Sequence, residues 1–168
     1  MKRNTAPFTF LLALFFLTFL YIGCKKNNDT QNTDSNFTGI TATINGKLWK
    51  CSKPVCTYDT IGGTVFFTGT GDAGSPGMMA LGVGDSATIG LTQPLRTEAL
   101  EVQFTNTGGT MYASDWFYGA YGSSTLTTMN KSTKRVSGTF SGVFFNPNNT
   151  QDSITVANGK FGGTYTKQ

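Results

Sequence analysis

The chain has 168 residues, with 13 Lys and Arg against 9 Asp and Glu, and a formal net charge of +4. It contains no histidine, which excludes Ser-His-Asp and Cys-His nucleophiles and every zinc site with an imidazole ligand. The basic residues are scattered along the sequence and form no basic stripe, so we expect no nucleic-acid partner.

Residues 1–23 resemble the signal peptide of a bacterial lipoprotein. A positive Met1-Lys2-Arg3 start is followed by an uncharged, mainly apolar run over 8–22 and then by Gly23-Cys24, the order of regions in a secretory signal. A Cys directly after a small residue resembles a lipobox, so we expect Cys24 to be acylated and to become the first mature residue. An uncleaved transmembrane anchor is the alternative, because 4–23 carries no charge.

The expected domain organisation has three parts. They are a signal peptide over 1–23, an acylated Cys24 with a flexible tether over 24–36, and a single domain over 37–168. The tether is expected because 25–36 holds no large apolar residue. Loss of 1–23 would leave 145 residues, the length of one domain, and would lower the net charge to +2, because Lys2 and Arg3 are removed.

The segment 37–168 is predicted to be all-β. Short runs of Thr, Val, Ile, Phe and Tyr alternate with turn residues, and no sustained helical period occurs after Cys24. Asn45-Gly46 and Asn158-Gly159 each follow an alternating run, so we expect both to be hairpin turns. Other strands are expected over 64–70, 78–84, 87–92, 99–104, 123–129 and 135–145. About nine or ten short antiparallel strands favour a β-sandwich or a small β-barrel.

The run 135–145 indicates one buried and one solvated face. Val136, Phe140 and Phe144 fall on one face, which they share with Gly138 and Gly142. Glycines among large apolar residues leave room for rings from a facing sheet, or for sharp curvature of the strand.

Cys51 and Cys56 form an even pair once Cys24 is assigned to the lipid. In an oxidising compartment such a pair favours a disulfide, here across a turn that contains Pro54. Two free thiols are the alternative. A redox-active pair is less favoured, because the spacing is not Cys-x-x-Cys.

Five aromatic residues fall between Tyr112 and Tyr121. If this segment is extended, Tyr112, Trp116 and Tyr118 share one face. Exposed Trp and Tyr rings are typical of contact surfaces for sugars or proteins, which makes these three residues the candidate binding site. The alternative is that the rings cap one end of the β core.

No sequence pattern indicates catalysis, a metal or a cofactor. Glu98 and Glu101 are close in sequence, but their odd spacing places them on opposite faces of a strand. A glycosidase pair formed by distant carboxylates is a less favoured alternative. The sequence contains no Asp-x-Asp-x-Asp-Gly loop, so it predicts no dedicated calcium site.

The two ends of the predicted domain resemble those of an uncharacterised group of Bacteroidota lipoproteins. The opening match runs Phe37-x-x-Ile40-x-Ala42-x-Ile44-Asn45-Gly46-Lys47-x-Trp49, and the closing match covers 136–140 and 156–161. The resemblance implies a cell-envelope β-domain on the outer membrane, and it carries no established activity.

We therefore expect a non-catalytic, lipid-anchored envelope protein that binds a protein or a glycan. One alternative is a small β-barrel with an apolar ligand in its interior, which requires a cavity of several hundred Å³. The other is an unrecognised glycoside hydrolase, which requires two carboxylates facing one cleft. The sequence leaves open the ligand, the oligomeric state and the side of the membrane that the domain faces.

Overall fold

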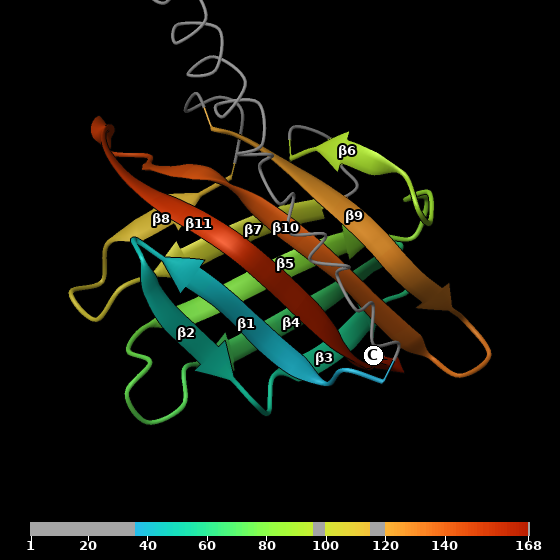
Figure 1. The fold of residues 1–168 in the computed structure, drawn as a ribbon. Helices are drawn as coiled ribbons and strands as arrows, with labels where there is room; N and C mark the ends of the chain where they lie inside the picture. Colours follow the sequence, from blue (N-terminus) through green and yellow to red (C-terminus); the bar gives the residue numbers. More distant parts are fainter. Residues whose placement is uncertain (1–35, 96–99, 115–119, 168) are drawn as a thin grey trace, which may run out of the picture. The chain divides into compact units, whose positions relative to one another are not determined.

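The computed structural model describes residues 36–95, 100–114 and 120–167. Within these ranges the chain is all-β, as predicted, and contains no helix (Figure 1). The strands are β1 (Gly39–Ile44), β2 (Lys47–Cys51), β3 (Val55–Asp59), β4 (Thr64–Thr70), β5 (Met78–Gly84), β6 (Thr92–Pro94), β7 (Leu100–Thr105), β8 (Met111–Ala113), β9 (Tyr121–Asn130), β10 (Arg135–Asn146), β11 (Asn149–Thr164) and β12 (Thr166–Lys167). Residues 33–168 form one compact unit that contains every described core residue, so we take this unit to fold without the residues before it.

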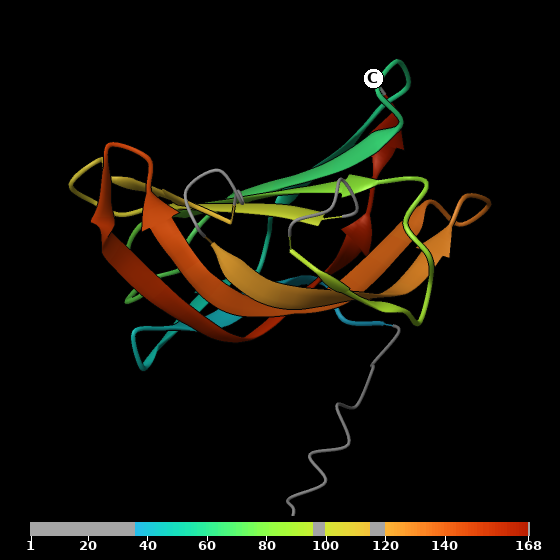
Figure 2. The same cartoon turned by 90° about the horizontal axis from the view of Figure 1, so that it is seen from above.

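The strands form one continuous sheet in the order β12-β3-β4-β5-β7-β8-β10-β11-β1-β2, with β9 on β10 and β6 on β9. The sheet folds over so that β3, β4, β5 and β7 face β1, β2, β10 and β11 as two layers (Figures 1 and 2). It is not closed into a barrel, so the sandwich-like arrangement is the one adopted. All pairings between named strands are antiparallel except that of β12 with β3, which is parallel over two residues.

Most predicted strands are present with nearly the predicted limits. The spans of β4 and β5 are as predicted, and β10 extends the predicted strand by one residue. Four strands that the sequence did not predict, β3, β6, β8 and β12, raise the count above the nine or ten expected. The strand expected over 87–92 is not formed, because pairing with β9 begins at Thr92 and is preceded only by a bridge between Ile89 and Leu126.

The first Asn-Gly turn is confirmed and the second is wrong. Asn45 and Gly46 have φ angles of 47° and 78°, and they join β1 to β2 as the hairpin rule requires. Asn158 has a similar φ of 51°, yet β11 continues through it to Thr164. The register to both neighbouring strands shifts here, since Phe140 faces Gly159 while Gly142 faces Val156. Asn158 therefore forms a β-bulge.

The bulge changes which residues of β11 face the core. Before it, Ile154 and Val156 are buried, and after it Gly159, Phe161 and Gly163 are buried. One extra residue thus moves the inward positions from even to odd numbers, so the strand keeps an apolar inner face along its length.

Large rings fill the space between the two layers. The rings of Phe67 and Phe161 pack edge to face across the layers, with centroids 5.3 Å apart. Phe161 also covers Gly138, and Phe140 covers Gly159 on the neighbouring strand. A Cβ on Gly138 would lie 2.7 Å from the Phe161 ring, so these glycines make room for large rings. The rings come from the neighbouring strand of the same layer, not from a facing sheet as the sequence predicted.

The amino-terminal segment enters the domain on the outer face of β11. The carbonyl oxygen of Phe37 accepts a hydrogen bond from Arg135 at 2.8 Å, and the Lys160 ammonium lies 4.7 Å from the centre of the Phe37 ring. From there β1 runs from Gly39 to Ile44, about 17–20 Å at the usual rise of a strand. The Asn45-Gly46 turn therefore lies at the end of the domain remote from this entry point.

We expect Asn158→Val to destabilise the domain by about 1–2 kcal/mol, because a β-branched residue disfavours positive φ. Asn158→Gly should change the free energy of unfolding by less than about 0.5 kcal/mol, since glycine accepts this conformation. Urea denaturation of residues 33–168 measures both. Equal stability of the two variants would contradict the bulge.

Candidate binding groove

A groove of about 320 Å³ opens at the end of the domain that carries the Asn45-Gly46 turn. Its lining comes from both layers and from the loop 71–77, and consists of Ile44, Asn45, Lys47, Leu48, Trp49, Gly74, Pro76, Phe104, Asn106, Tyr112 and Ile154. A volume of this size falls within the usual range for small-molecule sites, which are mainly apolar with a few polar groups.

Trp49 and Phe104 join the two layers at the base of the groove. Their rings pack edge to face with centroids 6.2 Å apart, and Trp49 is only 3% exposed. The Trp49 indole N–H donates to the carbonyl oxygen of Pro76 at 3.1 Å. The indole thus has its single hydrogen bond satisfied within the protein, and its ring contributes apolar surface to the groove.

The loop 71–77 is bonded to β2, in the other layer from the strands β4 and β5 that it connects. The Asp72 backbone N–H donates to the Lys50 carbonyl oxygen at 2.7 Å, and the Lys50 backbone N–H donates to Ser75 Oγ at 3.1 Å. The Asp72 carboxylate accepts from the Ser52 backbone N–H and hydroxyl at 3.0 and 2.6 Å. These bonds lower the Asp72 pKa and hold the wall formed by Gly74 and Pro76 in place.

Tyr112 forms another part of the wall and is anchored at its hydroxyl. The hydroxyl donates to the Asp152 carboxylate at 3.2–3.3 Å, and the Asn146 amide donates to the same carboxylate at 3.0 Å. Burial, followed by the bond to Asp152 and its charge, raises the pKa of Tyr112. The phenol therefore stays neutral at ordinary pH, and its ring is fixed with an exposed fraction of 8%.

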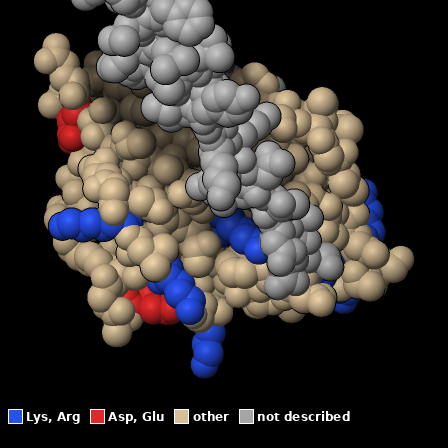
Figure 3. All heavy atoms as spheres, in the orientation of Figure 1, with Lys and Arg blue, Asp and Glu red and all other residues tan. Residues whose placement is uncertain are grey.

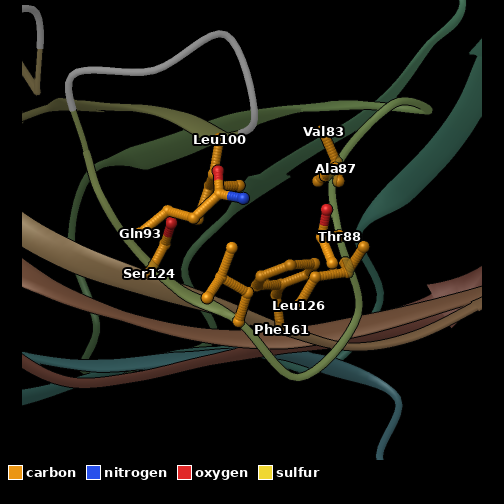
Figure 4. Close-up of a pocket in the computed structure, with 9 residues that line it drawn as sticks. Val83, Ala87, Thr88, Gln93, Leu100, Ser124, Leu126 and Phe161 are labelled. Atoms are coloured by element: carbon orange, nitrogen blue, oxygen red, sulfur yellow. The ribbon is translucent and has the colours of Figure 1, made fainter.

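A second cavity, lined by residues that include Val83, Leu126 and Phe161, has a volume of about 10 Å³ (Figure 4). Figure 4 shows the labelled side chains of both layers converging on this small space. It is about the smallest volume that holds one water molecule, whereas the end groove has room for an organic ligand.

Of the three candidate binding residues predicted from the sequence, the structure describes only Tyr112. Tyr112 lines the groove, and its ring also belongs to the core. Trp116 and Tyr118 lie outside the described residues, so their grouping with Tyr112 is untested. Tyr121, at the end of the same aromatic segment, is 56% exposed.

The expected disulfide between Cys51 and Cys56 is not formed, and both thiols are free. The two side chains pack over different positions of β4. The Cys51 sulfur lies against Gly69, while Cys56 stands opposite Phe67 and packs against the core. Burial raises the pKa of the Cys56 thiol to about 12. The thiol is therefore protonated and a poor nucleophile.

The described carboxylates are dispersed. Asp59 accepts a hydrogen bond from Ile61 in its own turn, and Asp85 accepts from Tyr58 and Lys131, each at 3.2 Å. The described part of the chain contains no cluster of three or more His, Cys, Asp or Glu side chains suited to a metal. Lys and Arg are also dispersed over the face shown in Figure 3. Glu98 and Asp115 fall outside the described ranges.

Comparison with known proteins gives no relative for this chain: no family model, curated protein or solved structure matches it. The resemblance to Bacteroidota lipoproteins therefore stays a prediction. Among the described residues, no helix has the length and apolar character needed to cross a membrane.

Several groove residues carried no signal that sequence reasoning could use. Trp49 and Lys47 were assigned only to a hairpin, and Phe104 only to a strand. Their grouping depends on pairings between distant segments, such as Ile44 with Val156 and Phe104 with Tyr112. In the structure, Leu48 is 70% exposed beside the buried Trp49.

We expect both thiols of folded residues 33–168 to resist alkylation and to react fully, without any reductant, once the protein is unfolded. The reason is that Cys51 is buried and the Cys56 pKa is about 12. Iodoacetamide labelling followed by intact mass in buffer and in guanidinium measures this. A requirement for reductant in the denaturant would show that the disulfide forms after all.

Proposed function

We propose that this protein is a lipid-anchored, non-catalytic binding domain of the cell envelope, with a ligand site in the end groove. The single observation that carries the site is the groove of about 320 Å³, lined largely by apolar residues from both layers. Its base and wall are held by bonds from Trp49 and Tyr112 to other parts of the protein. Such a rigid, preformed site is typical of small-molecule recognition.

The groove suits a small ligand or a single inserted side chain better than a flat glycan. Sugar platforms present exposed ring faces, but Trp49, Phe104 and Tyr112 are each less than 10% exposed. The cavity of about 10 Å³ near Phe161 is too small for the apolar ligand of the barrel alternative. The hydrolase alternative lacks support among the groove residues, because none of them is a carboxylate.

The membrane anchor rests on the sequence around Cys24 and agrees with the placement of the groove. The chain enters the domain at Phe37, and the groove lies beyond the far end of β1. A tether that ends at Phe37 would therefore join the domain remote from its binding site, leaving the groove open to its ligand.

Cys24→Ser should abolish lipid labelling and leave the full-length precursor, because the serine hydroxyl cannot accept the lipid as a thioether. Metabolic labelling with an alkyne fatty acid in a bacterial host, followed by intact mass, measures both. Cys51→Ser is the matched control and should be labelled normally. Normal labelling of the Cys24 variant would contradict acylation at this position.

The groove is tested by mapping small apolar and sugar probes on residues 33–168 by NMR. We expect chemical-shift changes at the Trp49 indole N–H and at Ile154, and none at Val83 beside the interior space. Leu48→Asp should weaken binding about tenfold, because it places a charge in the apolar mouth. Val55→Asp, at an equally exposed aliphatic position outside the groove, should not. Shifts that avoid the groove, or equal effects of the two variants, would contradict the proposal.

A further inference from the structure

Three polar side chains of the groove lining, Asn45, Lys47 and Asn106, present hydrogen-bond donors. Lys47 is the first residue of β2, where Trp49 and Cys51 are buried and Lys47, Leu48 and Lys50 are exposed. Because alternate residues of a strand share a face, Lys47 lies on the inward face of β2 beside Trp49, at the mouth of the groove. Among the described residues it forms no ion pair and no hydrogen bond of its side chain.

The two asparagines of the lining have their acceptor atoms occupied. Asn45 Oδ1 accepts from the Thr155 backbone N–H at 2.8 Å, and Asn106 Oδ1 accepts from the Thr110 backbone N–H at 3.0 Å. These bonds fix the orientation of each amide, and they leave the NH₂ groups as the donors that a ligand can use. Both asparagines therefore add to the donor character of Lys47.

Two acceptors near the groove already have partners within the protein. Pro76 accepts from the Trp49 indole, and the Asp152 carboxylate accepts from Tyr112 and Asn146. The Tyr112 hydroxyl is committed to Asp152 as a donor. No carboxylate lines the groove, so nothing there compensates the Lys47 charge.

We propose that the groove binds a small amphipathic anion, an apolar body that ends in a carboxylate. This inference rests on the proposed binding function of the same groove. The apolar body lies against Trp49, Phe104 and Ile154, and the carboxylate lies at the Lys47 ammonium. A charge-assisted bond to an ammonium beside an apolar surface gives both affinity and orientation.

Lys131 at the opposite end of the domain supports this assignment by contrast. Its ammonium lies 3.2 Å from the Asp85 carboxylate, which also accepts from Tyr58. That cation is neutralised within the fold, whereas Lys47 is presented to an apolar groove without a counter-ion. An unpaired cation thus lies at the groove of about 320 Å³.

The experiment uses three probes that share one body: 4-phenylbutyrate, 4-phenylbutanol and 4-phenylbutylammonium. They are titrated into residues 33–168, and dissociation constants are taken from NMR shifts at Trp49 and Ile154. We expect the carboxylate to bind about tenfold more tightly than the alcohol and the ammonium to bind most weakly. Raising the salt concentration should weaken the carboxylate and leave the alcohol unchanged.

Two variants locate the charge that is responsible. Lys47→Met should remove the preference for the carboxylate, a loss of about tenfold or 1.4 kcal/mol, while the alcohol binds as before. Lys50→Met, on the exposed face of the same strand, should change neither. Retention of alcohol binding by Lys47→Met also shows that the variant is folded.

The results distinguish failure of the anionic-ligand assignment from failure of the groove as a binding site. Equal affinity of wild-type protein for carboxylate and alcohol, or an unchanged preference in Lys47→Met, overturns the assignment of an anionic ligand and leaves the groove as a binding site. Absence of shifts at Trp49 and Ile154 with all three probes overturns the ligand class and counts against the groove itself.

Discussion

The fold depends on one left-handed residue, Asn158, in the middle of its longest strand. β11 pairs with β10 on one side and with β1 on the other, and both registers shift at this position. A regular strand of this length would turn half of its apolar residues to the wrong face, because Val156 and Phe161 differ in parity. The bulge keeps both in the core, and the strand then continues into β12, which pairs with β3 of the opposite layer.

This connection makes the two ends of the domain different. At the end of β12 the layers are joined by backbone pairing to Thr57 and Tyr58 and by the packed rings of Tyr58 and Tyr165. At the other end β8 pairs with β7 of one layer and, at Ala113, with β10 of the other, while the loop 71–77 bonds to the β2 edge through Lys50 and Ser52. The groove is lined by residues of both connections, Tyr112 of β8 and Gly74 and Pro76 of the loop.

Much of the fold follows from local patterns, while the groove does not. Alternation gave the limits of β4 and β5, and positive φ explains why Asn45-Gly46 is a turn. Asn158-Gly159 was indistinguishable from it locally, because a hairpin and a bulge both place Val156 and Phe161 on one face. Pairing with β1 and β10 decides between them. The groove joins residues as distant as Ile44 and Ile154, which no local pattern can bring together.

The same alternation that builds the core also determines the chemistry of the groove. Phe140 and Phe161 occupy the space above Gly159 and Gly138, and the groove lies at the end of the layers. The position of Lys47 at that end is fixed by the register of β2. A one-residue slip of β2 would move Lys47 to the other face and turn Trp49 and Cys51 out to solvent. Burial of Trp49 therefore holds an unpaired cation at the mouth of an apolar groove, where an anionic group would compensate it.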